Sequence, residues 1–254
     1  MLRAERYQLL INAVNKNGFV TSDDLAEMLG ISRSTIQRDL LELDTMHKLV
    51  RTRGGAISIK NGTSHEPSLE LRKDSQNAEK QRIALAALNY VRENDTILLD
   101  SGTTTIRLAE LLNSFKWLMA ATYDLNIASV LSEIQNVELV VIGGVQRKGF
   151  NTLNGYFAEM IIQQMHSDVL FLSADAIDLD HGYMCYNIAE ISVKKALMKA
   201  SREVVALCDH TKFDKIAFIN ICGLKEVHTI ITGKELNSET LSRLREMDIK
   251  VILA

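Results

Sequence analysis

The chain has 254 residues, 46% of them hydrophobic and 24% charged, which is the composition of an ordinary globular protein with ample core material. No stretch approaches the roughly 18 apolar residues that a membrane span needs, and the charged start MLRAER lacks the apolar core of a signal peptide. The three cysteines have no metal-site spacing, so they predict buried thiols in a reducing cytoplasm, with neither a metal nor a cofactor. The charge is unevenly distributed, because residues 1–60 carry nine Lys/Arg against seven Asp/Glu, whereas the whole chain has a net charge of −3.

The first forty-five or so residues predict three short helices. Residues 3–16 place apolar side chains at helical spacing, and Gly18 ends that helix. Polar residues 21–24 offer N-caps for a second helix, which Gly30 ends. Ser32 is the expected N-cap of a third helix with the sequence RSTIQRDLLEL. The short turn between the second and third helices is typical of a helix-turn-helix.

The third helix carries the prediction of DNA binding. One side bears Ile36, Leu40 and Leu43, which we expect to pack on the first two helices. The opposite side presents hydroxyl, amide and guanidinium groups, which bond phosphates and base edges in a major groove. The predicted DNA-contacting residues of this helix are Arg33, Ser34, Thr35, Gln37 and Arg38. The alternative is a solvated amphipathic helix.

A basic hairpin follows. Residues 48–53 predict a strand, Gly54-Gly55 a tight turn, and residues 56–59 the returning strand. This pattern predicts a wing beside the helix-turn-helix, with Arg51 and Arg53 placed to touch the DNA backbone or a minor groove.

The composition then changes. Residues 60–75 are polar and contain the only proline, Pro67, so we predict a linker between a DNA-binding domain (1–59) and a larger domain (76–254). The larger domain alternates helices with apolar strands and is predicted to be α/β, with a mainly parallel sheet covered on both faces. The predicted strands are 96–100, 117–122, 137–142, 168–174, 203–208, 227–231 and 249–253.

The loop after the first of these strands, from Asp100 to Thr105, is the best candidate for a ligand site. It follows a buried strand and opens a helix, and Gly102 allows close approach of the backbone. The free N–H groups and hydroxyls of Ser101, Thr103 and Thr104 would suit a phosphate or carboxylate. The alternative is a threonine-rich helix cap with nothing bound.

Other polar residues follow other strands, and parallel strands bring such residues to one edge of a sheet. Asp175 ends one strand, and a later strand leads into Asp209 and Lys212. Lys212 would supply positive charge, and Asp209 would accept a ligand hydroxyl. Taken singly, residues of this kind are more often solvated loop residues, but a set of polar groups at strand ends favours a site.

Several motifs resemble the DeoR family of bacterial regulators. The N-terminal ones are Ser32–Leu40 and Leu49–Ala56, and those of the larger domain include DSGTTT (100–105), CYNIAE (185–190) with Val193-Lys194, and DHTKF (209–213). The resemblance implies a winged helix joined to a sensor domain that is similar to the ribose-5-phosphate isomerase fold and binds phosphorylated sugars. Gln37 and Arg53 depart from the family pattern, which leaves the operator sequence open.

The resemblance also implies roles for individual residues. Lys212 would neutralise a phosphate held by the 101–104 loop, and the sugar hydroxyls would contact Asp100, Asp175, Glu190 and Asp209. Residues 123–126 and 184–187 are most similar to regulators of deoxyribose operons, so deoxyribose 5-phosphate is a candidate effector. The predicted partners are operator DNA, this effector and at least one further copy of the chain.

A sugar-phosphate isomerase with an appended DNA-binding domain is the competing interpretation, because carboxylates and a lysine near a phosphate can transfer protons. An RNA-binding winged helix is a third, but aromatic stacking residues for it are lacking. We favour a transcriptional repressor of a sugar or nucleoside catabolic operon, relieved by its effector, and not an enzyme.

Overall fold

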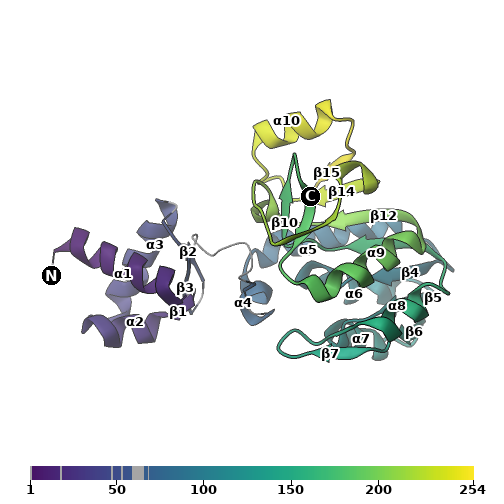
Figure 1. Ribbon diagram of the computed structural model, residues 1–254, viewed down its shortest axis with the longest axis horizontal. Coiled ribbons are helices and arrows are strands. Elements are labelled where there is room, and N and C mark those ends of the chain that lie inside the picture. Colours follow the sequence, from purple (N-terminus) through teal and green to yellow (C-terminus); the bar gives the residue numbers. More distant parts are fainter. Residues whose placement is uncertain (1, 18, 47, 53, 59–65, 68) are drawn as a thin grey trace. The chain divides into compact units, whose positions relative to one another are not determined.

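The computed structural model describes residues 2–17, 19–46, 48–52, 54–58, 66–67 and 69–254 (Figure 1). The chain separates into two compact units, Met1–Ser75 (unit 1) and Gln76–Ala254 (unit 2). Within the described residues, no helix has the length and apolar character that crossing a bilayer requires.

Unit 1 contains the three predicted helices, α1 (Arg3–Asn17), α2 (Ser22–Leu29) and α3 (Arg33–Thr45). The side chain of Thr21 accepts a hydrogen bond from Asp24 N, and that of Ser32 accepts one from Thr35 N, so the expected caps begin α2 and α3. The core of the unit is built from one apolar face of each helix, comprising Leu10, Val14, Leu25, Ile36, Leu40 and Leu43 together with Leu49.

The hairpin of unit 1 differs from the prediction in that a further strand pairs with it and in the place of Gly55. Strands β1 (Phe19–Thr21), β3 (Gly55–Ile57) and β2 (Val50–Arg51) form an antiparallel sheet in that order. Gly55 is not a turn residue, because it pairs with Thr21 at the start of β3. A Cβ at this position would lie 2.0 Å from the carbonyl oxygen of Val20, so the glycine permits close approach of β1.

The predicted linker contains an unexpected helix, α4 (Leu69–Asp74). Its sequence LELRKD lacks glycine and proline and consists of good helix formers, with the exception of its terminal aspartate. Residues 60–65 and 68 of that linker, and Arg53 of the predicted wing, lie outside the described residues.

Unit 2 is built on a seven-stranded parallel sheet in the order β15-β14-β12-β9-β4-β5-β6, which confirms the predicted mainly parallel α/β class. The strands, each within a few residues of its prediction, are β4 (Thr96–Leu99), β5 (Leu118–Thr122), β6 (Val137–Val141), β9 (Ser167–Leu172), β12 (Ser201–Leu207), β14 (Thr229–Thr232) and β15 (Val251–Leu253).

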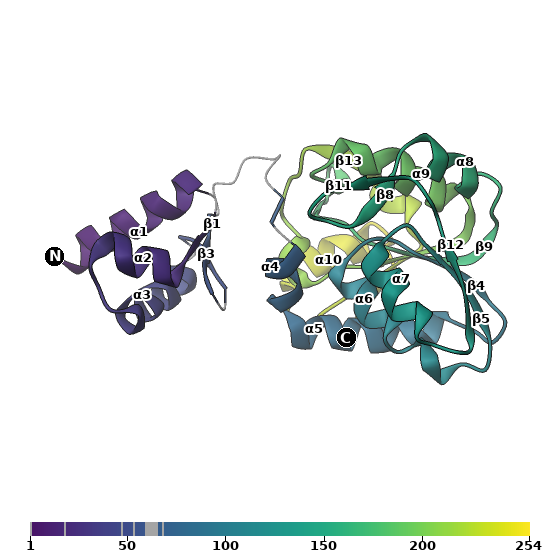
Figure 2. The same ribbon diagram turned by 90° about the horizontal axis from the view of Figure 1, so that it is seen from below.

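Helices cover both faces of this sheet (Figure 2). One face packs against α5 (Asn77–Ala87), α6 (Thr103–Ala109) and α7 (Leu125–Ser132), and the other against α8 (Tyr156–Ile162), α9 (Ile191–Lys199) and α10 (Ser238–Glu246). Successive side chains of β4 alternate between the two cores, with Ile97 and Leu99 in one and Leu98 in the other. Burial on both faces explains why residues 97–99 of this strand are all apolar.

Two small antiparallel elements were not predicted. One is the hairpin of β7 (Val145–Arg147) and β8 (Thr152–Asn154), and the other is the sheet of β10 (Ala176–Asp178), β11 (Gly182–Cys185) and β13 (Ile219–Cys222). Strands of three or four residues have too few positions to show a periodicity. Short 3-10 helices complete the unit: η1 (Leu88–Tyr90), η2 (Leu112–Ser114), η3 (Ile188–Glu190), η4 (His210–Lys212) and η5 (Leu224–Glu226).

Candidate functional site

Helix α3 turns a polar surface outward, as predicted. Arg33, Ser34 and Arg38 are exposed, and Thr35 and Gln37 are half-buried. The apolar residues of the opposite side are almost completely buried. Arg33 lies 3.2 Å from the carboxylate of Asp23, but both side chains are more than half exposed, so this pair holds the guanidinium only weakly.

An ion pair that the sequence did not predict fixes the orientation of α3. Asp39 is 3% exposed, and it accepts hydrogen bonds from Arg6 Nε at 2.5 Å and Arg6 Nη2 at 3.1 Å. The hydrogen bond to Asp39 raises the pKa of Arg6. The Tyr7 hydroxyl donates to Glu42 at 2.5 Å, and Arg3 forms an ion pair with the same carboxylate, so these contacts also tie α3 to α1. The sequence feature that could have indicated this pair is an acidic residue, Asp39, on the apolar side of the predicted third helix.

The hairpin adds one described cation beside the helix. Arg51 is exposed, and its backbone N–H donates to the carboxylate of Asp44 at the end of α3, at 3.1 Å. This bond connects β2 directly to α3, so Arg51 keeps a defined place relative to the exposed side of the helix.

In unit 2 the strand order reverses between β4 and β9. The chain runs from β4 outward to β5 and β6, and from β9 outward through β12 to β14 and β15. In open parallel sheets, ligands bind beyond the carboxyl ends of the strands at such a reversal. The loops after β4 and β9, and after the adjacent β12, therefore form the candidate site.

The loop after β4 is anchored by Asp100, which is completely buried. One carboxylate oxygen accepts the Tyr123 hydroxyl at 2.6 Å, and the other accepts Lys194 Nζ at 2.6 Å and Ser173 N at 2.7 Å. Both oxygens accept hydrogen bonds from the protein and the side chain has no exposed surface, so Asp100 does not face a sugar hydroxyl in this structure. The structure therefore revises its predicted role to that of an internal anchor.

The remainder of this loop is held tightly. The Ser101 hydroxyl donates to Asp124 at 2.6 Å, which removes it as a free phosphate donor. A Cβ on Gly102 would lie 2.1 Å from Ser173 Oγ, so glycine is required for the close approach of the β9 loop. Thr104 is buried and Thr103 is half-buried. Ser101 is half-buried too, but its hydroxyl is committed to Asp124, so of the predicted hydroxyls Thr103 is the best placed to meet a ligand.

The loop after β12 carries two more of the predicted residues. Asp209 is 2% exposed and caps η4 by accepting Thr211 N at 3.0 Å, and Lys212 is half-buried. Burial by itself would raise the pKa of Asp209. The charges of Lys212 and Lys80 and the hydrogen bonds from Thr211 lower it by more, so the pKa of Asp209 lies below its usual value and the carboxylate stays charged.

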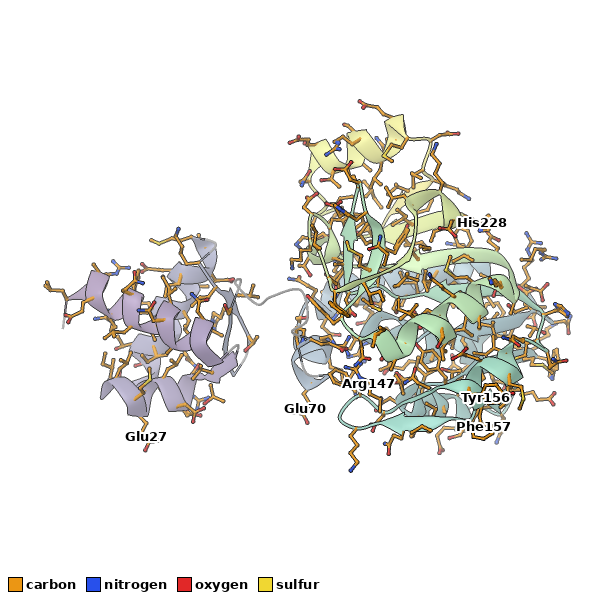
Figure 3. The ribbon with its side chains drawn as sticks, in the orientation of Figure 1. Glu27, Glu70, Arg147, Tyr156, Phe157 and His228 are labelled. Carbon is orange, nitrogen blue, oxygen red and sulfur yellow. The ribbon has the colours of Figure 1, made fainter. Side chains whose placement is uncertain are left out.

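The remaining two predicted carboxylates are also held by the protein. Asp175, half-buried after β9, accepts Tyr186 N at 3.1 Å. Glu190 is 6% exposed and forms an ion pair at 2.8 Å with Arg147 of β7, which Figure 3 labels. The Thr152 hydroxyl donates to the same carboxylate at 3.3 Å, so the β7–β8 hairpin is joined to η3.

Lys194, which the sequence analysis did not place in the site, lies among these groups. It is 3% exposed, and although burial would lower its pKa, Asp100 and Glu190 raise it above the usual value, so the ammonium is retained. Its charge and those of Asp175 and Glu190 all act on the Cys185 thiol. Its ammonium also donates to the carbonyl oxygen of Ser173 at 3.3 Å, so one lysine joins the loops after β4 and β9. The sequence feature that could have indicated this role is a lysine on the apolar side of the segment that forms α9.

Comparison with known proteins gives consistent matches for both units. A family model described as the DeoR C terminal sensor domain matches residues 75–234, and the DeoR-like helix-turn-helix domain matches residues 6–62. An Escherichia coli O157:H7 protein, named as a candidate aga operon transcriptional repressor, is 32% identical over 98% of this chain and 93% of its own length. The regulator GolR of Listeria innocua is 29% identical over all of both chains.

Solved structures give weaker matches. Ribose 5-phosphate isomerase A from Neisseria gonorrhoeae is 18% identical with a TM-score of 0.40, over 55% of this chain and 54% of its own. The enzyme from Methanocaldococcus jannaschii is 15% identical with a TM-score of 0.41, over 55% of each chain.

Proposed function

This chain belongs to the DeoR family of transcriptional regulators, and we propose that it represses a sugar or nucleoside catabolic operon until a phosphorylated sugar binds unit 2. It is a DNA-binding regulator and not an enzyme, since its relatives over the full length are named as regulators and repressors. Unit 1 would contact the operator through α3 and the hairpin, in the cytoplasm where the DNA lies.

The observation that carries the ligand proposal is that Lys194 joins the loops after β4 and β9 at the reversal of the strand order, with Lys212 on the loop after the adjacent β12. Lys212 and the 101–104 loop would hold the phosphate, and Asp175, Glu190 and Asp209 would face the sugar hydroxyls. Lys194 would keep Asp100 in place and neutralise its charge, so that Lys212 and the backbone N–H groups of the 101–104 loop would attract the phosphate. Deoxyribose 5-phosphate is our first candidate.

The regulation we propose requires more than one copy of the chain. A single winged helix contacts few base pairs, and typical operator affinities require two modules on two half-sites. The ligand would favour a spacing of the DNA-binding units that does not fit the operator. A coupling of about 1–3 kcal/mol between the two sites corresponds to a change of about 5–150-fold in operator affinity.

Two measurements test this function. A thermal-shift screen against a panel of sugar phosphates should raise the melting temperature for the effector alone, because a ligand that binds only the folded state stabilises it. A gel shift on the DNA upstream of the chain's own operon should show a complex that this ligand dissolves. A panel with no stabilising sugar phosphate, or a complex that the stabilising ligand strengthens, would contradict the proposal.

A further inference from the structure

Helix α5 begins directly after the boundary between the two units. Gln76, its N-cap residue, has a left-handed backbone with φ of 51°, and it is the first residue of unit 2. The first turn of α5 then buries two charged side chains, since Glu79 is 3% and Lys80 is 2% exposed. Burying charges is costly unless they are paired, so their partners show what this turn is built to hold.

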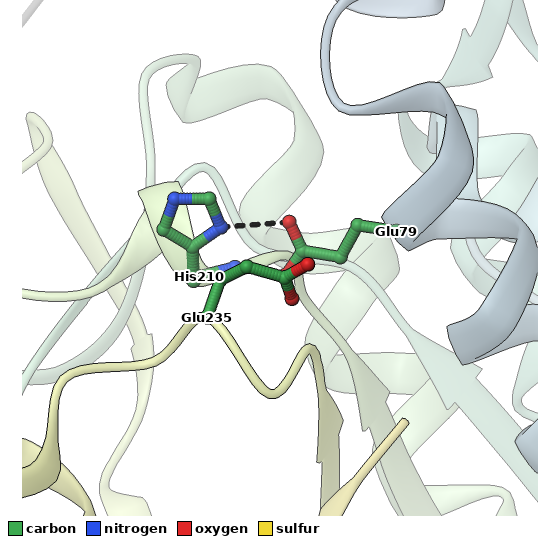
Figure 4. Close-up of side chains that lie close together, drawn as sticks. All are labelled: Glu79, His210 and Glu235. Atoms are coloured by element: carbon green, nitrogen blue, oxygen red, sulfur yellow. Dashed lines mark hydrogen bonds and ion pairs between the residues drawn. The ribbon is translucent and has the colours of Figure 1, made fainter.

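Glu79 holds the loop after β12. One of its carboxylate oxygens accepts His210 N at 2.7 Å and Gly233 N at 3.1 Å, and the other lies 2.7 Å from His210 Nδ1 (Figure 4). A Cβ on Gly233 would lie 2.2 Å from the same carboxylate, so this position requires glycine for the contact to form. One side chain of α5 thus joins the loops that follow β12 and β14.

Lys80 acts on the same loop at the preceding residue. Burial raises the pKa of Asp209, and Lys80 is one of the charges that lower it, together with Lys212. Two consecutive residues of α5 therefore engage two consecutive residues of the loop, by hydrogen bonds to His210 and by charge on Asp209. The loop also carries Lys212, to which the proposed function assigns the phosphate.

Glu235, a further acidic residue near His210, does not change this interpretation. Glu79, His210 and Glu235 have potential metal ligands within 4.8 Å of one another. However, Glu235 accepts two hydrogen bonds from Arg82, at 2.6 and 2.7 Å, and both oxygens of Glu79 are already engaged. The protein itself satisfies these carboxylates, so the cluster is a joint between elements.

We propose that the Glu79–His210 pair, with Lys80 beside it, is the link that carries ligand binding at the 209–212 loop to the start of α5. Unit 1 is attached to the chain at that point, so a shift of the first turn of α5 reaches the DNA-binding unit through the backbone. This inference rests on the proposed function only in assigning Lys212 and its loop to the ligand. Glu79 and His210 are positioning residues that do not contact the ligand.

The test is amide hydrogen exchange on the full chain, with and without saturating deoxyribose 5-phosphate, in segments 69–83 and 205–215. His210→Ala removes a ring that is 30% exposed and keeps the backbone contact to Glu79. Arg82→Gln is the matched control, because it breaks an ion pair one turn further along α5 that does not involve the loop. In the wild type and in Arg82→Gln, the ligand should slow exchange in both segments.

In His210→Ala the ligand should still slow exchange at 205–215, while its effect at 69–83 disappears. If the ligand slowed exchange at 69–83 in His210→Ala as much as in the wild type, the link would be overturned. If His210 had a merely structural role, the substitution would weaken the ligand's effect in both segments together. Without ligand, His210→Ala should speed exchange in the first turn of α5 by about tenfold relative to Arg82→Gln, as expected for a lost hydrogen bond to a charged group. If the sugar phosphate does not bind the wild type, the proposed function fails, and equal exchange in the two ligand-free variants overturns the link separately.

Discussion

The two candidate surfaces of this chain use charge in opposite ways. The DNA-contacting residues come from one short stretch of sequence, and their cations Arg33, Arg38 and Arg51 are exposed. The ligand-site residues come from loops more than a hundred positions apart, and most of their charges are buried and paired within the protein. A surface that binds a polyanion needs free cations, whereas a small-molecule site needs groups that are already fixed in place.

The largest effect should follow from removing the buried cation of unit 2. Lys194→Met leaves the completely buried Asp100 without its ammonium partner, and breaking such a pair costs about 3–5 kcal/mol. Urea unfolding followed by circular dichroism should show this loss in the transition of unit 2.

The double variant Asp100→Asn with Lys194→Met provides the control. It removes both charges, so it should recover part of the stability lost in the single variant. A single variant as stable as the wild type would mean that the pair is solvated, and the contrast between the two surfaces would fail.

The second effect concerns the exposed cation of α3. Arg38→Ala should weaken operator binding by about 5–150-fold, the range that corresponds to a base contact worth about 1–3 kcal/mol. Binding of the sugar phosphate and the unfolding of unit 2 should not change. Arg38→Lys restores the charge without the two-pronged geometry, so it should recover affinity for all sequences but not discrimination between them. Unchanged operator binding in Arg38→Ala would exclude this side of α3 from the DNA interface.

The third effect is the reverse of the second. Lys212→Ala should weaken sugar-phosphate binding by about tenfold, the cost of a hydrogen bond between charged groups, and leave operator binding intact. Isothermal titration calorimetry measures the first and a gel shift the second. Lys225→Ala, which removes an exposed cation of η5, is the matched control and should change neither. Full induction in Lys212→Ala would show that the phosphate is held elsewhere.

The contrast also explains what the sequence could predict. The exposed side of α3 follows from helical periodicity and the Ser32 cap, because both depend on residues close together in the chain. The parallel sheet follows in the same way from largely apolar segments that alternate with helices. Strand order, and with it the position of the site between β4 and β9, depends on long-range pairing that local patterns do not encode.

The partners of charged groups were beyond local reasoning for the same reason. Asp100 was predicted to contact a ligand, yet its partners Lys194 and Tyr123 come from distant parts of the chain. Asp39 and Lys194 both interrupt an apolar helix face, and such interruptions predict that a partner exists without identifying it. When a charged residue interrupts an apolar pattern, its partner in the fold must therefore be identified before a functional role is assigned to it.

The smallest expected effect distinguishes phosphate contacts from base contacts within unit 1. Arg51 is exposed at the edge of the hairpin, where it would meet the DNA backbone. Each phosphate contact releases condensed counterions. Arg51→Ala should therefore make the negative slope of log affinity against log salt shallower by about one unit per copy, and it should weaken binding to all DNA sequences alike. Arg245→Ala removes an exposed cation of α10 in unit 2 and should leave the slope unchanged. A loss confined to the operator sequence would instead place Arg51 against base edges, so the hairpin would share the sequence recognition assigned here to α3.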